Sequence, residues 1–162
     1  MRKYLIVALL LLVATIGFTE DSRSPKWPSV RAAFLKSNNG ANAVCAICGW
    51  GPGAQSFNSR LLNVHHVKPF SKDPKLELDP TNFITLCESK YPGFNCHLEV
   101  GHSGSFRLEN PWIREDAAKL HDMFLKYKGY TVLPKEMEDY LAFIKQRVKK
   151  YNCDMYQYRC NK

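Results

Sequence analysis

Histidine and cysteine, the side chains best suited to proton transfer and metal binding, are concentrated in one part of this 162-residue chain. The stretch from Leu61 to His102 holds four of the five histidines and two of the six cysteines. Imidazoles exchange protons near neutral pH and are common metal ligands. Packing alone does not explain so many of them in one short segment, so we expect a reaction centre here.

The order of these residues fits the hydrolysis of a phosphodiester bond. That reaction needs a base that deprotonates water and a cation that stabilises charge on the phosphate and the leaving oxygen. His65 and His66 are adjacent at the end of an apolar run, and neighbouring strand residues point to opposite faces. One can therefore face a metal while the other faces the water. Asn82 follows this pair along the chain and can fix the long loop that carries the base. His97 can complete the metal site from a following helix.

The cysteines form a second set. Cys45 and Cys48 stand two residues apart before a glycine that permits a tight turn, and Cys87 and Cys96 are the expected partner pair. Four thiolates make a closed tetrahedral zinc site, which contributes to folding rather than to chemistry. A Cys-x-x-Cys pair is too short for a comfortable internal disulfide, which favours zinc. The second pair is widely spaced, so the loop 88–95 has to bulge out between its two ligands.

The N-terminus supports a different interpretation of the cysteines. Residues 1–19 combine a basic start with an apolar run from Leu5 to Phe18, as secretory signal peptides do. The run is shorter than the roughly 20 residues of a spanning helix, but no clean cleavage site follows, so an uncleaved membrane anchor stays open. We expect a protein that is exported (secreted or periplasmic) or anchored to a membrane.

Exported proteins usually pair their cysteines, and six cysteines fit three disulfides as well as one zinc site. Cys153 and Cys160 form either a local disulfide or two free thiols.

The chemistry-bearing residues need a strand, a loop, a second strand and a helix to position them. We expect a strand over Leu61–His65, a loop over Lys72–Thr81 that Pro74 and Pro80 keep irregular, and a strand over Phe83–Leu86. A helix starting after Cys96 would carry His97 in its first turn.

Three further helices are predicted around this unit. The first starts at Ser29 as its cap and ends at Asn38-Asn39-Gly40. The second begins at Asn110-Pro111 and stops at Gly129, and the third runs from about Pro134 to Tyr151. Both C-terminal helices carry an apolar stripe. The opposite face of the third is basic, and we favour a solvated surface over phosphate contacts for its four cations: Lys145, Arg147, Lys149 and Lys150.

The sequence resembles the HNH endonucleases of the ββα-metal (His-Me finger) superfamily over roughly residues 43–106. The residues that carry the resemblance are Cys45-Ala-Ile-Cys48, Val64-His65-His66-Val67-Lys68-Pro69, Asn82-Phe-Ile-Thr-Leu86-Cys87, Cys96-His97 and Gly101-His102. The resemblance implies an α+β fold: a small ββα-metal (HNH) core with a four-cysteine zinc knuckle, flanked by a short N-terminal helix and two C-terminal amphipathic helices.

The resemblance also implies roles for individual residues. His66 corresponds to the general base, and His65 to the metal ligand before it, a place often filled by Asp. Asn82 corresponds to the middle residue that orients the loop, and His97 to the histidine that binds the catalytic metal from the helix. His102 follows His97 by five residues rather than four, which turns it off that helix face. It would ligate the metal, contact phosphate or merely sit nearby.

The expected cofactors are a structural Zn²⁺ and a catalytic divalent metal. Mg²⁺ is the usual ion of the superfamily, although histidine ligands also suit Zn²⁺, Mn²⁺ or Ni²⁺. No small-molecule cofactor is expected. The formal charge of +8, or +6 without residues 1–19, favours a polyanionic partner, although a basic surface that aids solubility explains it as well.

Together these features predict a metal-dependent endonuclease that cuts DNA, double-stranded and with low sequence specificity. The predicted organisation is a signal peptide or anchor (1–19), a linker (20–28), an HNH nuclease domain (29–110) and a helical extension packed on it (111–162). Two alternatives stay open. One is a zinc-stabilised module that binds nucleic acid without cutting it, and the other is an exported protein held by disulfides without bound metal.

Overall fold

The computed structural model describes residues 23–36, 43–52, 58, 61–88, 95–128 and 132–156. Its elements follow in the order α1 (Trp27–Lys36), β1 (Leu62–His66), the short turns η2 (Pro74–Leu76) and η3 (Pro80–Asn82), β2 (Phe83–Cys87), η4 (His97–Gly101), α2 (Ile113–Lys126) and α3 (Lys135–Tyr156). None of the helices within these ranges is long and apolar enough to cross a membrane. The predicted signal peptide or anchor lies outside the described residues.

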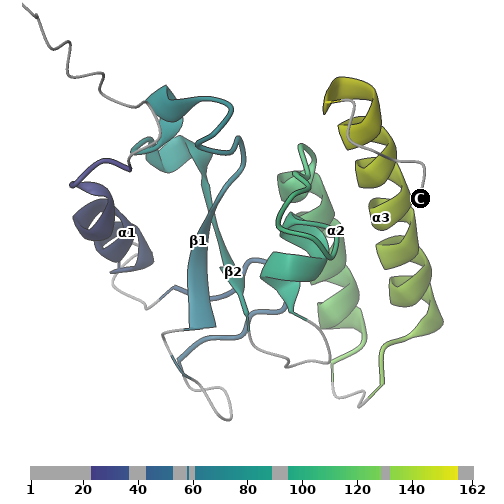
Figure 1. Cartoon of the computed structure of the whole chain (residues 1–162). Coiled ribbons are helices and arrows are strands. Elements are labelled where there is room, and N and C mark those ends of the chain that lie inside the picture. Colours follow the sequence, from purple (N-terminus) through teal and green to yellow (C-terminus); the bar gives the residue numbers. More distant parts are fainter. Residues whose placement is uncertain are drawn as a thin grey trace, which may run out of the picture.

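The centre of the fold is the antiparallel hairpin of β1 and β2. His66 pairs with Phe83 at one end, next to the pair of His65 and Ile84, and Leu62 pairs with Cys87 at the other end. Figure 1 shows α1 on one side of the hairpin and η4, α2 and α3 on the other. Because both faces are covered, every residue of β2 is buried. The fold is therefore α+β with the ββα arrangement that the sequence predicts.

Several element boundaries differ from those predicted. β1 and β2 each extend one residue further, to His66 and Cys87, and α3 continues five residues beyond Tyr151. α1 begins at Trp27, so Ser29 lies inside the helix, where its hydroxyl donates to the Lys26 carbonyl instead of capping the helix start. The earlier start places the Trp27 ring against His66, with ring centroids 4.6 Å apart. This contact is tertiary, so local capping rules do not predict it.

The two C-terminal helices share one apolar core with the hairpin and η4. The buried positions that fit the predicted stripes are Ile113, Ala117 and Leu120 in α2 and Met137, Ile144 and Val148 in α3. They pack in the same cluster as Ile47, Leu86 and Val100. The extension therefore packs on the core, while the predicted boundary between 110 and 111 stays a prediction.

The expectation of a solvated basic face on α3 is wrong for Arg147. Its Nη2 lies 2.6 and 2.7 Å from the two carboxylate oxygens of Asp116, which is completely buried. A buried carboxylate requires a cation or hydrogen-bond donors, and α2 carries Asp116 directly beneath α3. Lys145 likewise pairs with Glu99 of η4 at 2.6 Å. Two of the four cations thus hold α3 against its neighbours.

Candidate active site and metal clusters

Three histidines meet at the end of the hairpin. His65 comes from β1, and His97 and His102 come from the start of η4 and the residue after it. One nitrogen of each ring lies within 4.8 Å of the others, and the ring centroids are 4.9 to 5.2 Å apart. Burial lowers the pKa of both His65 and His102, which keeps the imidazoles in the neutral form that binds metal. The donors thus fit a divalent ion.

The helix geometry explains how His102 joins this cluster. The sequence predicts that a five-residue spacing turns His102 away from His97 on an α-helix. η4 is a π-helix, whose hydrogen bonds link residues five apart, so His97 and His102 face the same way. Gly101 makes the close approach possible. A β-carbon at this position would lie 3.0 Å from the His65 ring.

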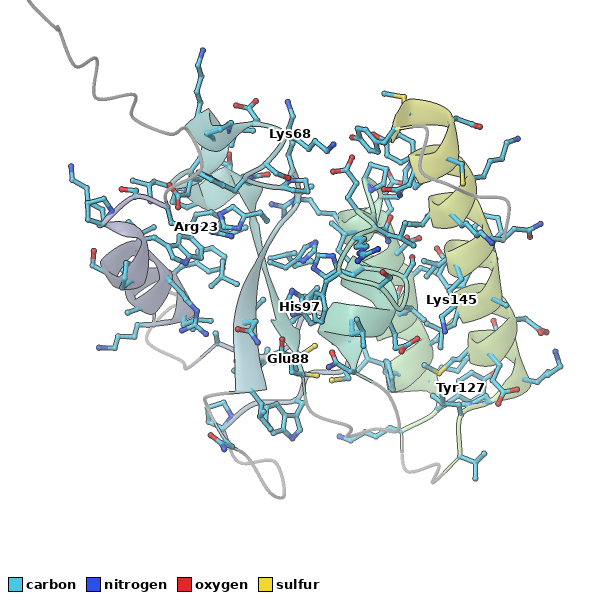
Figure 2. All side chains as sticks on the ribbon, in the orientation of Figure 1. Arg23, Lys68, Glu88, His97, Tyr127 and Lys145 are labelled. Carbon is cyan, nitrogen blue, oxygen red and sulfur yellow. The ribbon has the colours of Figure 1, made fainter. Side chains whose placement is uncertain are left out.

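Hydrogen bonds fix the orientation of two of the three rings. His97 Nδ1 donates to Glu88 Oε1 at 2.9 Å, and His102 Nδ1 donates to the Leu108 carbonyl at 2.8 Å. Each bond leaves Nε2 for a metal, as outer partners of metal-binding histidines do. Figure 2 shows Glu88 beside His97. The sequence interpretation missed Glu88, whose only signal is an acid directly after Cys87.

His66 points to the other face of β1. Its Nε2 lies 2.9 Å from the Glu77 carbonyl oxygen. Because a carbonyl only accepts, Nε2 carries the hydrogen and Nδ1 is left to take a proton. Burial lowers the pKa of His66, so the ring is neutral at neutral pH. The Glu77 carboxylate accepts two bonds from the Ser24 backbone N–H, at 2.9 and 3.1 Å, which holds the N-terminal segment over this site.

Asn82 ties together the two ends of the loop that joins the strands. Its Oδ1 accepts from the Lys68 N–H at 2.8 Å, and its Nδ2 donates to the carbonyls of Lys68 at 3.0 Å and Leu76 at 3.3 Å. All three amide bonds are thus used on backbone groups. The loop residue Glu77, whose carbonyl accepts from His66, directly follows one of these partners. Asn82 therefore fixes the loop that contacts His66.

The four cysteines gather at the opposite end of the hairpin. Their sulfur atoms lie within 4.8 Å of one another, and the Cys48 and Cys87 sulfurs are 3.6 Å apart. Tetrahedral zinc with bonds of about 2.3 Å places its sulfurs about 3.8 Å apart, so the spacing fits. Hydrogen bonding from Cys48 lowers the pKa of Cys45, which favours a thiolate there.

The knuckle itself has the geometry that its sequence predicts. Gly49 adopts a φ of 69°, and its N–H bonds to the Cys45 carbonyl at 2.9 Å. The Ala46 N–H bonds to Thr85 of β2 at 2.9 Å, which fixes the knuckle to the hairpin. The alternative of three disulfides is wrong, because the four cysteines of this cluster are free thiols. Cys153 is disulfide-bonded.

The remaining histidine has an ordinary structural contact. His121 Nδ1 donates to the Ile47 carbonyl at 3.0 Å, on α2. Every other histidine and every cysteine of the two clusters lies between residues 45 and 102.

The fold and the site together define a class of small α+β proteins that have an open histidine cluster and a closed cysteine cluster. Residues 45–103 match the family model of the HNH endonucleases. This segment is thus similar to the HNH endonucleases, and both clusters lie within it. No curated protein and no solved structure matches the chain.

Proposed function

We propose that this protein is a metal-dependent endonuclease that hydrolyses phosphodiester bonds in DNA. The observation that carries the proposal is that the two adjacent histidines at the end of β1 face different partners. His65 faces two further histidines, while its neighbour His66 faces a backbone carbonyl that fixes its tautomer. This arrangement supports a metal site and a general base on opposite faces of one strand end.

The residues would act as follows. Nδ1 of His66 accepts a proton from the attacking water, and the Glu77 carbonyl stabilises the resulting imidazolium through Nε2–H. Asn82 positions the base by holding the loop. His65, His97 and His102 would hold a divalent ion, which when bound supplies positive charge to the phosphate and the leaving oxygen.

The donor set bears on the identity of the ion. Three imidazoles suit Zn²⁺, Ni²⁺ or Mn²⁺, whereas Mg²⁺ prefers oxygen ligands and water. With His102 in the cluster, we infer that a transition-metal ion supports cleavage better than the Mg²⁺ expected from the resemblance. The cysteine cluster would hold a structural Zn²⁺. Cleavage rates measured with each ion in turn test this order.

The proposed substrate is double-stranded DNA, cut with low sequence specificity. The formal charge of +8 supports contacts to phosphates, which carry no sequence information. Cleavage of unrelated plasmids at many positions would support it. Cleavage confined to a single recognition sequence would contradict it.

A cleavage assay on supercoiled plasmid DNA, with and without chelator, tests the activity. We expect the His66→Ala variant to lose cleavage by a factor of about 10² to 10⁴, because removal of a general base costs that much. His121→Ala is the matched control, since His121 lies outside both clusters, and it should still cut. If His66→Ala cuts like the unchanged protein, the assignment is wrong. DNA binding without cleavage by the unchanged protein would support the non-catalytic module instead.

We also propose that residues 1–19 direct export or anchor the protein to a membrane. The disulfide at Cys153 supports an oxidising compartment. Cell fractionation and N-terminal sequencing of the mature protein distinguish secretion, periplasmic location and anchoring. Recovery of the intact chain from the cytosol would contradict the proposal.

A further inference from the structure

A cleft of about 520 Å³ opens directly beside the histidine cluster. His102 forms part of its wall, and the rest comes from the loop after η4, the loop after β1 and the end of α3. Phe106, Arg107 and Tyr156 line it and lie beyond residue 103, where the match to the HNH family ends. Six of the ten described residues that line the cleft therefore lie outside the segment that the family model matches.

Phe106 is the most unusual side chain of the cleft. The residue is 61% exposed, although its ring lies 4.9 Å from the His102 ring and 5.7 Å from the His97 ring, centroid to centroid. A large exposed apolar ring beside a candidate metal site presents a flat face to whatever binds there. Such a face is well suited to stacking on a nucleobase.

Tyr156 provides a second aromatic ring in the cleft. Lys72 Nζ lies 3.5 Å from the centre of this ring, a cation–π contact that holds the ammonium group inside the cleft. The Tyr156 hydroxyl donates to the Glu109 carboxylate. Glu109 is the one acid among the described residues that line the cleft, and this bond engages it.

The wall that carries Phe106 is held in place by α3. Asn152 is buried, and its side chain makes two bonds to the backbone of Glu109: Oδ1 accepts from the N–H at 3.1 Å, and Nδ2 donates to the carbonyl at 2.8 Å. These bonds fix the loop against the helix. The two rings and the two cations, Lys72 and Arg107, are therefore presented by a formed structure.

Aromatic rings interleaved with cations are the combination that binds single-stranded nucleic acid, because an unpaired base exposes its π-face and a paired base does not. We propose that the cleft binds an unpaired nucleotide, with its base stacked on Phe106 and its phosphate near Lys72 and Arg107. The inference rests on the proposed function only in making the neighbouring phosphate the one that is cut. Within double-stranded DNA, gapped or frayed sites are then bound in preference to perfectly paired ones.

Fluorescence anisotropy with labelled oligonucleotides tests the proposal without requiring cleavage. The ligands are an oligothymidine of about ten nucleotides, an abasic strand of the same length and a duplex of the same length. The full zinc-loaded protein is titrated without added divalent metal, and a denaturing gel checks that each strand remains intact. We expect the unchanged protein to bind oligothymidine about tenfold more tightly than the abasic strand, because one stacked base contributes that much.

The Phe106→Ala variant should remove this difference and leave binding of the abasic strand within about twofold, since the phosphates and cations are unchanged. Phe143→Ala is the matched control, because Phe143 is an exposed aromatic residue on α3 outside the cleft, and it should keep the full difference. Tyr156→Phe keeps the ring and should also keep most of it.

Equal affinity of the unchanged protein for oligothymidine and the abasic strand would overturn the proposal. Equal losses for oligothymidine, abasic strand and duplex on Phe106→Ala would overturn it as well, because they would mean a general distortion rather than a lost base contact. Neither result bears on whether His66→Ala abolishes plasmid cleavage. Failure of the proposed catalysis is thus recognised separately.

Discussion

The two ligand clusters lie at opposite ends of one hairpin and differ in how they face solvent. At the Cys87 end, four thiols converge, and three of them are completely buried. At the His65 end, one ring nitrogen from each of three histidines converges among the described residues. A cleft of about 520 Å³ lies beside them. Four thiols would fill every position of a tetrahedral ion at the first end, and three imidazoles would leave at least one position open at the second. The difference supports the proposal that the first is structural and the second catalytic.

The two clusters are also directly connected. Cys96 and His97 are consecutive residues at the start of η4, so the same turn of helix carries one member of each cluster. β2 likewise carries Cys87, and the next residue is Glu88, which orients His97. A metal at the closed cluster would therefore fix the spacing of the open one, whereas loss of the open cluster leaves the closed one intact. The predictions below test this asymmetry.

The largest effect is expected for Cys96→Ser. Structural zinc contributes on the order of 10 kcal/mol to folding, and a lost thiolate removes much of it. We expect loss of bound zinc, of the cooperative thermal unfolding transition and of all cleavage. Metal analysis and circular dichroism measure the first two. A variant that unfolds at the same temperature as the unchanged protein would show that the cysteine cluster does not support the fold.

His97→Ala should affect activity alone. The variant loses one ligand of the open cluster, and we expect cleavage to fall at least a hundredfold while one zinc per chain and the unfolding temperature are retained. Plasmid cleavage, metal analysis and calorimetry are measured on the same preparation. Loss of this remaining zinc together with activity would contradict the separation of the two clusters.

Glu88→Gln should have a smaller effect on the same cluster. The amide can still hydrogen-bond His97 Nδ1 but carries no charge, and loss of such an outer partner typically costs about 10- to 100-fold in metal affinity. The metal concentration that gives half-maximal cleavage should rise by about that factor. Cleavage at saturating metal should recover most of its rate. An unchanged metal concentration for half-maximal cleavage would show that Glu88 does not support metal binding.

The sequence predicts those parts of the site that depend on residue type and short-range order. The strand pair, the alternation of His65 and His66, the cysteine knuckle and the loop fixed by Asn82 all follow from motif spacing and strand geometry. Glu88 could not be predicted in this way, because an acid at a strand end is common and only its distance to His97 gives it a role. The ion pair of Arg147 could not be predicted for the same reason, since its buried partner Asp116 lies on another helix.

The position of His102 shows the limit most clearly. On an α-helix, five residues separate two side chains in direction as well as in distance, and the sequence contains no signal for a π-helix. Two bonds from residues that follow η4 accompany the wider turn: the Asn110 side chain donates to the Val100 carbonyl at 3.0 Å, and the Gly104 N–H bonds to the Leu98 carbonyl at 2.8 Å. Both donors, Asn110 and Gly104, lie outside η4 itself.

Gly101→Ala tests that geometry and should have the smallest effect. The added β-carbon would lie 3.0 Å from Cε1 and 3.1 Å from Nδ1 of His65, and 3.3 Å from Leu86 Cδ1. Because the His65 ring packs against the rings of His97 and His102, it can yield only by shifting relative to them. Overpacking of this kind typically costs about 1–3 kcal/mol. We therefore expect metal affinity at the open cluster to fall severalfold while the cysteine cluster keeps its zinc. Cobalt titration followed by absorption measures both, since thiolate ligands give charge-transfer bands that imidazoles do not. Unchanged cobalt affinity at the histidines would show that the π-helix does not need a glycine to bring them together.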